Sequence, residues 1–296
     1  MSDGFFLAPL PQRLAMGDQI ELRGPEAHHL AVVRRIRAGE TVTVSDGAGR
    51  GASGPVTALG AGLVSVAVAA VLAGEPSRPE ITLVQALPKN ERAQQAVDLM
   101  TELGVDRIVP WQAARSIVRW QGERGAKGRA KWQAWAGQAA QQARRLTVPQ
   151  VAPPASTAEV AQLLAAAGQA IIMHESATTP IAARPIDPSS PLVCVIGPEG
   201  GIAPDELARF EAAGARPWSM GPTVLRTTVA GGVAVAQLRL LAMQAVLAAS
   251  AGERGGEAAG RVTAGPAAGA GDSGVVGPQD GSPVRGGPEN RGEGEG

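Results

Sequence analysis

The sequence is poor in several residue types, and each shortage excludes a class of protein. Only one of its 296 residues, Cys194, is a cysteine, which excludes a disulfide framework and a cysteine-based metal cluster. The chain has no tyrosine, and its 27 basic residues balance 27 acidic ones. A net charge of zero gives no global attraction to a polyanion. Any charged partner must therefore be recognised by a local cluster.

Motifs of common cofactor sites and membrane segments are missing too. The sequence holds no Gly-x-Gly-x-x-Gly after the first strand of its α/β pattern, no Walker Gly-Lys-Ser/Thr and no Gly-x-Ser-x-Gly elbow. Residues 1–20 lack a basic start followed by an apolar core, and no uninterrupted apolar run approaches about 18 residues. These absences predict a cytoplasmic protein with no membrane partner.

The single cysteine and two of the histidines are poorly placed to act as a nucleophile or as metal ligands. Cys194 lies inside an apolar run, which predicts a core thiol rather than a nucleophile. His28 and His29 are adjacent and would face different ways on a helix, so we expect no metal site there.

Residues 1–73 predict a small β-barrel domain. Short strands punctuated by Gly/Asp turns are expected at 20–22, 41–44, 54–59 and 63–68. Between them, residues 25–37 predict a helix with Arg34, Arg35 and Arg37 at its C-terminal end. Arginines there suit the helix dipole, and they equally suit RNA phosphates. The sequence leaves both interpretations open.

Residues 74–79 form a proline-rich hinge, and from residue 80 the pattern changes to alternating strands and helices. Strands are expected at 81–86, 107–110, 170–173 and 192–196, and helices at 90–103, 127–145, 158–167, 204–213 and 230–248. This alternation predicts an α/β domain over 80–249, with a parallel sheet covered on both faces. Residues 250–296 are Gly, Ala, Pro and scattered charge, which predicts a disordered tail.

The second domain is organised around the segment 192–202. An unbroken apolar run ends in Gly197-Pro198-Glu199-Gly200-Gly201 and leads into Pro204-Asp205-Glu206, which predicts a buried strand, a tight loop and a helix start. A second Gly-Pro segment follows at 220–227. Open parallel sheets bind ligands where such loops leave the strands, and glycine lets backbone approach a ligand.

Positive charge is concentrated in residues 107–145, where Glu123 is the only acid. The segment holds Arg107, Arg115, Arg119, Arg124, Lys127, Arg129, Lys131, Arg144 and Arg145, interleaved with Trp111, Trp120, Trp132 and Trp135. Clustered cations bind phosphates, and exposed indoles stack on bases. The alternative is a solvated cationic face with core or dimer-anchoring tryptophans; the joint pattern favours nucleic acid.

Several motifs occur together in one order. They are Glu102-Leu103-Gly104-Val105-Asp106, Ile108-Val109-Pro110, Arg115-Ser116, Gln141-Gln142-Ala143-Arg144-Arg145, Ile196-Gly197-Pro198-Glu199-Gly200-Gly201 and Gly221-Pro222-Thr223-Val224-Leu225-Arg226-Thr227, preceded by Ala27-His28-His29-Leu30. In this combination the chain resembles the E-type 16S ribosomal RNA uracil-N3 methyltransferases over residues 5–245. The resemblance implies an α/β SPOUT domain with a trefoil knot and an N-terminal PUA-like barrel. It also implies S-adenosylmethionine as cofactor, 16S RNA of the small subunit as partner, and a homodimer.

The resemblance also implies roles for individual residues. Cofactor contacts would come from His174, Glu175, Ile196, Gly197, Pro198, Gly200, Gly201, Met220, Gly221, Leu225 and Thr227. Arg226 would orient the uracil and stabilise charge on its oxygens, unless it pairs with Glu199 or bonds to a loop carbonyl. Arg145 or Arg144 would hold the target, and Glu199 is a candidate base. RNA would contact Arg34, Arg35, Arg37, Arg115, Arg119 and Arg144. No metal ligand is expected.

Two positions depart from the family pattern. Many members have a glutamate where this chain has Thr228, and an acidic or basic residue where it has Gln141. Two other functions remain open: a SPOUT ribose 2′-O-methyltransferase, and a noncatalytic RNA-binding or ribosome-assembly protein.

Overall fold

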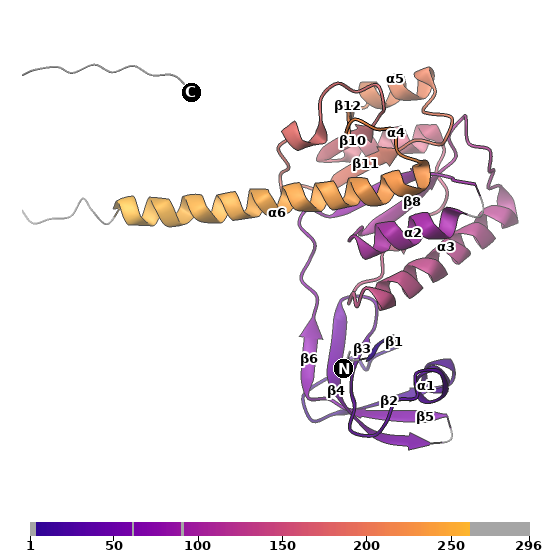
Figure 1. The fold of residues 1–296 in the computed structure, drawn as a ribbon, viewed down its shortest axis with the longest axis vertical. Coiled ribbons are helices and arrows are strands. Elements are labelled where there is room, and N and C mark those ends of the chain that lie inside the picture. Colours follow the sequence, from indigo (N-terminus) through magenta and orange to yellow (C-terminus); the bar gives the residue numbers. More distant parts are fainter. Residues whose placement is uncertain (1–3, 61, 90–91, 261–296) are drawn as a thin grey trace, which may run out of the picture. The chain divides into compact units, whose positions relative to one another are not determined.

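The computed structural model describes residues 4–60, 62–89 and 92–260, and these residues form two β-sheets with separate hydrophobic cores (Figure 1). Up to Ala251 the described chain belongs to one compact unit. Of the predicted tail at 250–296, residues 261–296 lie outside the described residues. The expected domain boundaries at 73, 80 and 249 stay predictions.

The first sheet is the predicted β-rich domain. Its strands are β1 (Gly4–Leu7), β2 (Gln19–Arg23), β3 (Thr41–Ser45), β4 (Arg50–Gly60), β5 (Leu63–Ala67) and β6 (Ala70–Ala73). They lie in the order β1-β3-β4-β5-β2, with β6 paired to β4, and only the β1–β3 pair is parallel. In β2 the apolar Ile20 and Leu22 are buried between exposed polar neighbours, because alternate side chains of a strand face opposite sides.

The predicted helix at 25–37 is shorter than expected, which corrects that prediction. Helix α1 (Pro25–His28) runs into a π-helical turn, η1 (His29–Val33), and Arg34 closes it through an N–H···O bond of 2.9 Å to His29. Arg35 then has φ of 53°, a left-handed conformation that ends helical geometry. Arg34, Arg35 and Arg37 are exposed, but they follow the helix instead of occupying its last turn.

The second sheet is parallel throughout, as predicted. Its strands are β7 (Ile81–Ala86), β8 (Arg107–Trp111), β9 (Gln150–Val151), β10 (Gln169–Met173), β11 (Leu192–Ile196) and β12 (Arg216–Trp218), in the order β12-β10-β11-β7-β8-β9. In β11, Cys194 and Ile196 enter one core whereas Val193 and Val195 enter another. Both faces of the sheet are therefore buried.

Helices cover these two faces (Figure 1). On one side lie α2 (Ala93–Glu102), α3 (Gly122–Gln142) and the beginning of α6 (Thr227–Gly260), and on the other lie α4 (Thr157–Ala166) and α5 (Pro204–Ala212). A 3₁₀ turn, η3, spans Ile181–Ala183. The predicted doubly covered α/β sheet is confirmed.

Helix α6 departs most from expectation. It begins at Thr227 and continues to Gly260, beyond both the predicted end at residue 248 and the predicted start of the tail at 250. Glycines at 252, 255 and 256 disfavour a helix individually, but extending an existing helix costs far less than nucleating one.

The part of α6 at Thr227–Ser250 is long and apolar enough to cross a membrane by length and composition, with a mean hydropathy of 1.6. Core helices of soluble proteins meet the same criterion, and Ala234, Val235 and Leu238 of this helix are fully buried in the domain core.

Candidate functional site at the carboxyl edge of the parallel sheet

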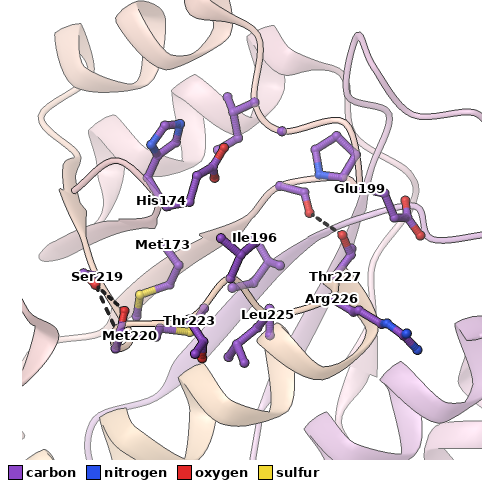
Figure 2. Close-up of a pocket in the computed structure, with 18 of the residues that line it drawn as sticks. Met173, His174, Ile196, Glu199, Ser219, Met220, Thr223, Leu225, Arg226 and Thr227 are labelled. Atoms are coloured by element: carbon purple, nitrogen blue, oxygen red, sulfur yellow. Dashed lines mark hydrogen bonds between the residues drawn. The ribbon is translucent and has the colours of Figure 1, made fainter.

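Three loops meet where β10, β11 and β12 end, and together they line a pocket of about 310 Å³ (Figure 2). They follow Met173, Ile196 and Trp218, the last residues of adjacent strands. Parallel strands place their carboxyl ends at one edge of a sheet, which is why segments distant in sequence converge here. We call this cavity the three-loop pocket.

The loop after β11 depends on glycine at two positions. A Cβ on Gly197 would lie 2.7 Å from Cγ1 of Ile202, so a larger residue would push the loop away from its own helix start. Gly201 has φ of +74°, a conformation that other residues rarely adopt, and its N–H donates to the carbonyl of Pro198 at 2.9 Å.

Side chains from outside the loop hold its carbonyls in place. Thr227 Oγ1 donates to the carbonyl of Gly197 at 3.1 Å, and Arg115 Nη1 donates to the carbonyl of Gly200 at 3.0 Å. The backbone N–H of Lys89, beyond the end of β7, approaches Glu199 Oε1 at 3.5 Å. The loop is thereby tied to α6, to the segment after β8 and to the segment after β7.

The loop after β12 is closed by its own serine. Ser219 Oγ donates to the carbonyl of Gly221 at 3.0 Å and accepts from the Gly221 N–H at 3.3 Å. Gln237 of α6 donates from Nε2 to the carbonyl of Met220 at 2.9 Å. These bonds fix the backbone of the wall opposite the glycine loop.

The loop after β10 contributes His174 and Glu175. The backbone N–H of His174 donates to the carbonyl of Trp218 at 3.0 Å, which continues the sheet pairing into the loop. Its Nδ1 lies 2.8 Å from Ser176 Oγ and accepts from the Ser176 N–H at 3.3 Å. With Nδ1 as an acceptor, the neutral ring carries its proton on Nε2.

The pocket is apolar in its middle and charged at one end. Met173, Ile196 and Leu225 line its centre, and Glu199 and Arg226 lie at one end, away from Ser219 and Met220 (Figure 2). Such a cavity suits a ligand with a flat apolar part and a charged part, held largely by main-chain groups.

Comparison with known families identifies the relatives of this chain. The family described as RNA methyltransferase domain matches residues 75–239, and the RNA methyltransferase PUA domain matches residues 22–68. A relative from Mycobacterium tuberculosis, named ribosomal RNA small subunit methyltransferase E, is 41% identical over 80% of this chain and 91% of its own length. The chain therefore belongs to the RNA methyltransferase family that includes this relative. The Bacillus subtilis protein of the same name is 26% identical over 76% of this chain and 91% of its own length.

Solved structures support this family assignment. Ribosomal RNA small subunit methyltransferase E from Neisseria gonorrhoeae, bound to S-adenosylmethionine, has a TM-score of 0.71 at 28% identity, covering 81% of this chain and 98% of that one. A Legionella pneumophila protein, also bound to S-adenosylmethionine, has a TM-score of 0.72 at 27% identity with the same coverage. The two-domain α/β fold expected from the resemblance is confirmed, whereas the trefoil knot stays a prediction.

In this methyltransferase-family chain, the structure brings together all the predicted cofactor residues except Gly200, which does not line the pocket. It adds Met173, Ile202, Ser219, Pro222, Thr223, Val224 and Ala230. Met173 and Ser219 flank predicted loop residues at strand ends, so extending each loop by one residue would have found them. The role of these residues in binding stays a prediction.

Arg226 lies at the rim of the three-loop pocket, and its predicted catalytic role stays a prediction. Its side chain is exposed and lines the pocket, and among the described residues its guanidinium makes no hydrogen bond or ion pair. The alternative of an ion pair with Glu199 is thus not seen. Because no described residue pairs with this guanidinium, it is available to bind a ligand.

Arg145 has a different environment from the one predicted. It is not among the pocket residues; its guanidinium donates to the carbonyls of Thr101, in the last turn of α2, and Val105, just beyond that helix, at 2.5 and 2.8 Å. Burial lowers the pKa of Arg145, and the nearby Asp106 partly offsets that effect. Within one chain this geometry supports a structural role and gives no support to catalysis by Arg145.

The other predicted RNA-contacting arginines divide into two groups. Arg115 bonds to Gly200, and Arg119 donates to the carbonyls of Ala113 and Ala114 at 3.0 and 2.8 Å, so both organise the loop after β8. Arg144 is exposed at the end of α3 with φ of 55°, and the barrel arginines Arg34, Arg35 and Arg37 are exposed as well. RNA contact by all six stays a prediction.

The two departures from the family pattern have different surroundings. Thr228 is only 2% exposed, and its Oγ1 has no hydrogen-bond partner among the described residues. Gln141 Oε1 accepts from the N–H of Leu7 at 3.4 Å. Neither residue lines the three-loop pocket.

Sequence reasoning missed one organising carboxylate, Glu206. It is 3% exposed; its Oε1 accepts from the Ala114 N–H at 2.8 Å and Thr157 Oγ1 at 2.7 Å, and its Oε2 accepts from the Ala203 N–H at 3.2 Å. It therefore joins the start of α5 to the loop after β8 and to α4. The signal was a glutamate at the third position of a helix, where it can cap the first turn.

Cys194 is fully buried in β11, and burial raises the pKa of its thiol, so the predicted core thiol is confirmed. Among the described residues, no group of three or more histidine, cysteine, aspartate or glutamate side chains is arranged to hold a metal ion.

Proposed function

We propose that this protein transfers a methyl group from S-adenosylmethionine to N3 of a uridine in 16S ribosomal RNA of the small subunit, in the cytoplasm. The observation that carries the proposal is the three-loop pocket with Arg226 and Glu199 at one end (Figure 2). Relatives named ribosomal RNA small subunit methyltransferase E, one of them bound to S-adenosylmethionine, support it.

The residues present fit S-adenosylmethionine. The volume of about 310 Å³ lies within the range of roughly 300–1,000 Å³ usual for small-molecule sites. Met173, Ile196 and Leu225 would wall the adenine, and loop amides and carbonyls would meet its ring edge and the ribose. Glu175 is a suitable partner for the cationic part of the ligand. The fit also depends on Gly197 and Gly201, since Cβ atoms there would disturb the loop.

The bound cofactor would supply an electrophilic methyl group on a positively charged sulfur. For transfer, uracil N3 loses its proton, its lone pair forms the bond to the methyl carbon, and the bond from that carbon to sulfur breaks with its electrons on sulfur. No covalent enzyme intermediate is needed. The protein must align N3 with the methyl group and stabilise the negative charge that spreads onto the flanking carbonyl oxygens O2 and O4.

Arg226 is suited to the second task. Its guanidinium is exposed at the pocket rim, and donors aimed at developing negative charge commonly contribute about 100- to 1,000-fold in rate. Glu199, at the same end, is a candidate to accept the N3 proton. Its approach to the Lys89 N–H would orient the carboxylate.

Mass spectrometry of the product nucleosides tests this proposal against its alternatives. Purified protein is incubated with S-adenosylmethionine and small subunits, or free 16S RNA, from a strain lacking the gene. We expect new 3-methyluridine and a reverse-transcription stop at that base, because N3 lies on the pairing edge. A new ribose methyl without the stop would indicate 2′-O-methylation, and no new methyl group would indicate a noncatalytic RNA-binding protein.

We also propose that the protein is a homodimer that uses the outer face of α6. Leu240, Met243 and Leu247 are 53%, 57% and 61% exposed, and their spacing places them on one side of the helix. A second copy would cover this apolar stripe. Light scattering should give twice the chain mass, and Leu240→Glu with Leu247→Glu should give monomers; a monomeric wild type that floats with lipid vesicles would contradict the proposal.

A further inference from the structure

A second cavity lies beside α3, separate from the three-loop pocket, and is lined by tryptophans and cations. We call it the aromatic groove and define it by Leu87, Trp120, Arg124, Lys127, Lys131 and Trp135. Its volume is about 360 Å³, and among the described residues that line it there is no carboxylate. Such a lining attracts an anion that also carries a flat apolar part.

The groove is built by close packing around one glycine. A Cβ on Gly128 would lie 2.5 Å from the Trp120 ring, so only glycine lets that indole lie across α3. Trp120 packs edge-on against Trp132, with ring centres 5.2 Å apart and planes at 73°. Both indoles are almost fully buried, and they therefore form the floor of the groove.

Trp135 is the indole that remains available. It is only partly buried, and the ammonium of Lys131 lies over its ring, 4.9 Å from the ring centre. A nucleotide can replace this contact, because its base stacks on the indole and its phosphate binds the released ammonium.

Three exposed cations follow the rim on successive turns of α3, at positions 124, 127 and 131. Lys127 is 3.7 Å from Glu123, but both side chains are more than 80% exposed, so this ion pair contributes little and can exchange for a phosphate. The rim thus presents a row of positive charge along one edge of an aromatic floor.

The groove adjoins the end of the three-loop pocket that holds Glu199. Leu87 and Pro88 line the groove, and the next residue, Lys89, approaches Glu199 through its backbone N–H at 3.5 Å. A strand of RNA whose uracil lies at Glu199 and Arg226 would therefore have neighbouring nucleotides close to the groove.

We propose that the aromatic groove binds an unpaired nucleotide flanking the target uridine, with its base on Trp135 and its phosphates on Arg124, Lys127 and Lys131. This rests on the proposed function, because it assumes that RNA is the substrate. We infer unpaired RNA as the ligand for two reasons. A base can stack on an indole only when it is not stacked in a duplex, and the cations form a row that suits successive phosphates rather than a single anion.

Binding of single-stranded hexauridylate to the full-length protein tests the proposal. Since the chain has five tryptophans and no tyrosine, and three tryptophans border the groove, fluorescence quenching reports its occupation. Each phosphate contact adds about 0.7 to the slope of log affinity against log salt, so Lys127→Ala with Lys131→Ala should lower that slope by about 1.4 and the affinity at about 0.1 M salt by about 25-fold. Arg209→Ala with Arg216→Ala, two exposed arginines outside the groove, removes the same charge and should change neither.

Stacking is tested separately at Trp135. Trp135→Ala should weaken binding by about 5- to 150-fold, whereas Trp135→Phe should retain most of it because a ring remains. Circular dichroism and S-adenosylmethionine affinity identify a variant that fails to fold, and Trp135→Phe then carries the test. Equal affinity for all variants and the control, or no quenching of the wild type, would overturn the proposal.

Methyl transfer distinguishes this failure from failure of the proposed function. If wild-type protein forms 3-methyluridine and Lys127→Ala with Lys131→Ala leaves KM for 16S RNA unchanged, the groove proposal is wrong and the proposed function stands. If the wild type forms no methylated nucleoside yet hexauridylate binding depends on the groove as described, the methyltransferase proposal fails and the groove remains an RNA site.

Discussion

The three-loop pocket and the aromatic groove are neighbours in one domain, but different chemical groups determine their shapes. The shape of the pocket depends on the backbone of its loops, through Gly197, Gly201 and hydrogen bonds to carbonyl oxygens. The groove is formed by the side chains of Trp120, Lys127 and Trp135 on a helix and the segment before it. Backbone sites hold one ligand in one orientation, whereas aromatic and cationic side chains tolerate many sequences.

Because one site depends on backbone conformation and the other on side chains, the two sites differ in how easily they can be recognised from the sequence. A backbone site requires particular residues at consecutive positions, since only glycine allows the approach or the positive φ. A side-chain site requires only residue types at helical spacing. The two sites should therefore fail independently when one of them is altered, and four predictions use that independence.

The largest effect is expected at Arg226. Arg226→Ala should reduce kcat by about 100- to 1,000-fold, because a donor to the developing charge on uracil is lost. The dissociation constant for S-adenosylmethionine, measured by calorimetry, and hexauridylate binding should stay unchanged. Equal losses of rate and cofactor affinity would instead assign Arg226 to holding its loop.

The next effect is expected at Gly197. Gly197→Ala places a Cβ 2.7 Å from Ile202, and such overpacking costs about 1–3 kcal/mol. Affinity for S-adenosylmethionine should fall while hexauridylate binding persists. Gly60→Ala is the control, because a Cβ there meets nothing within 4 Å. Retention of cofactor affinity by Gly197→Ala would show that the loop can adjust.

The opposite outcome is expected at Gly128. Gly128→Ala drives a Cβ to 2.5 Å from Trp120, which should displace the floor of the aromatic groove and weaken hexauridylate binding without loss of cofactor affinity. Gly137→Ala on the same helix is the matched control, since its nearest contact would be 4.0 Å away. The control should gain up to about 1 kcal/mol from helix propensity in urea unfolding. A similar gain in Gly128→Ala would contradict the packing described.

The smallest effect is expected away from both sites, at the start of α4. Ser156 Oγ and backbone N–H bond to Glu159, and these hydrogen bonds lower the pKa of Glu159 below its ordinary value of 4.5. Their contribution to stability is complete above that value and is lost as the pH falls through the lower pKa of the folded state.

Glu159→Gln should therefore reduce the free energy of unfolding at neutral pH by about 0.5 kcal/mol or less, because solvent screens the exposed carboxylate, and the difference from wild type should shrink in acid. Urea unfolding at several pH values measures it. A difference that grows below pH 4.5 would contradict the sign of this shift. Both ligand affinities should be untouched at neutral pH.

Much of the fold could be predicted because its elements have strong patterns. The unbroken apolar runs at Ile81–Ala86 and Leu192–Ile196 and the turn-bounded strands of the barrel lie close to where periodicity placed them. The strands β9 and β12, of two and three residues, were missed because so few residues show no period. The helix beyond residue 248 was missed because glycine content was weighed without the packed helix that precedes it.

The grouping of the candidate site residues could be predicted where a motif supplies consecutive residues, but not where a contact depends on distant neighbours. The structure brings the glycine loop and its opposite wall together in one pocket, whereas Arg145 bonds to the carbonyls of Thr101 and Val105 outside that pocket; the roles of these residues in binding and catalysis stay predictions. The linking role of Glu206 was overlooked because two of its three donors, Ala114 and Thr157, come from segments distant in sequence. A charged residue next to a motif does not show where its side chain points.

By itself the sequence determined the α/β class, the β-rich first domain, the two Gly-Pro loops and the family, because each can be recognised from residues that are close together in the sequence. The tertiary structure alone decided that the Arg226 guanidinium has no partner among the described residues while Arg145 has several, and that three tryptophans and three cations enclose one groove. The physical reason is that hydrogen bonding, burial and cavity shape depend on which distant segments meet, and the strand order of the sheet sets that.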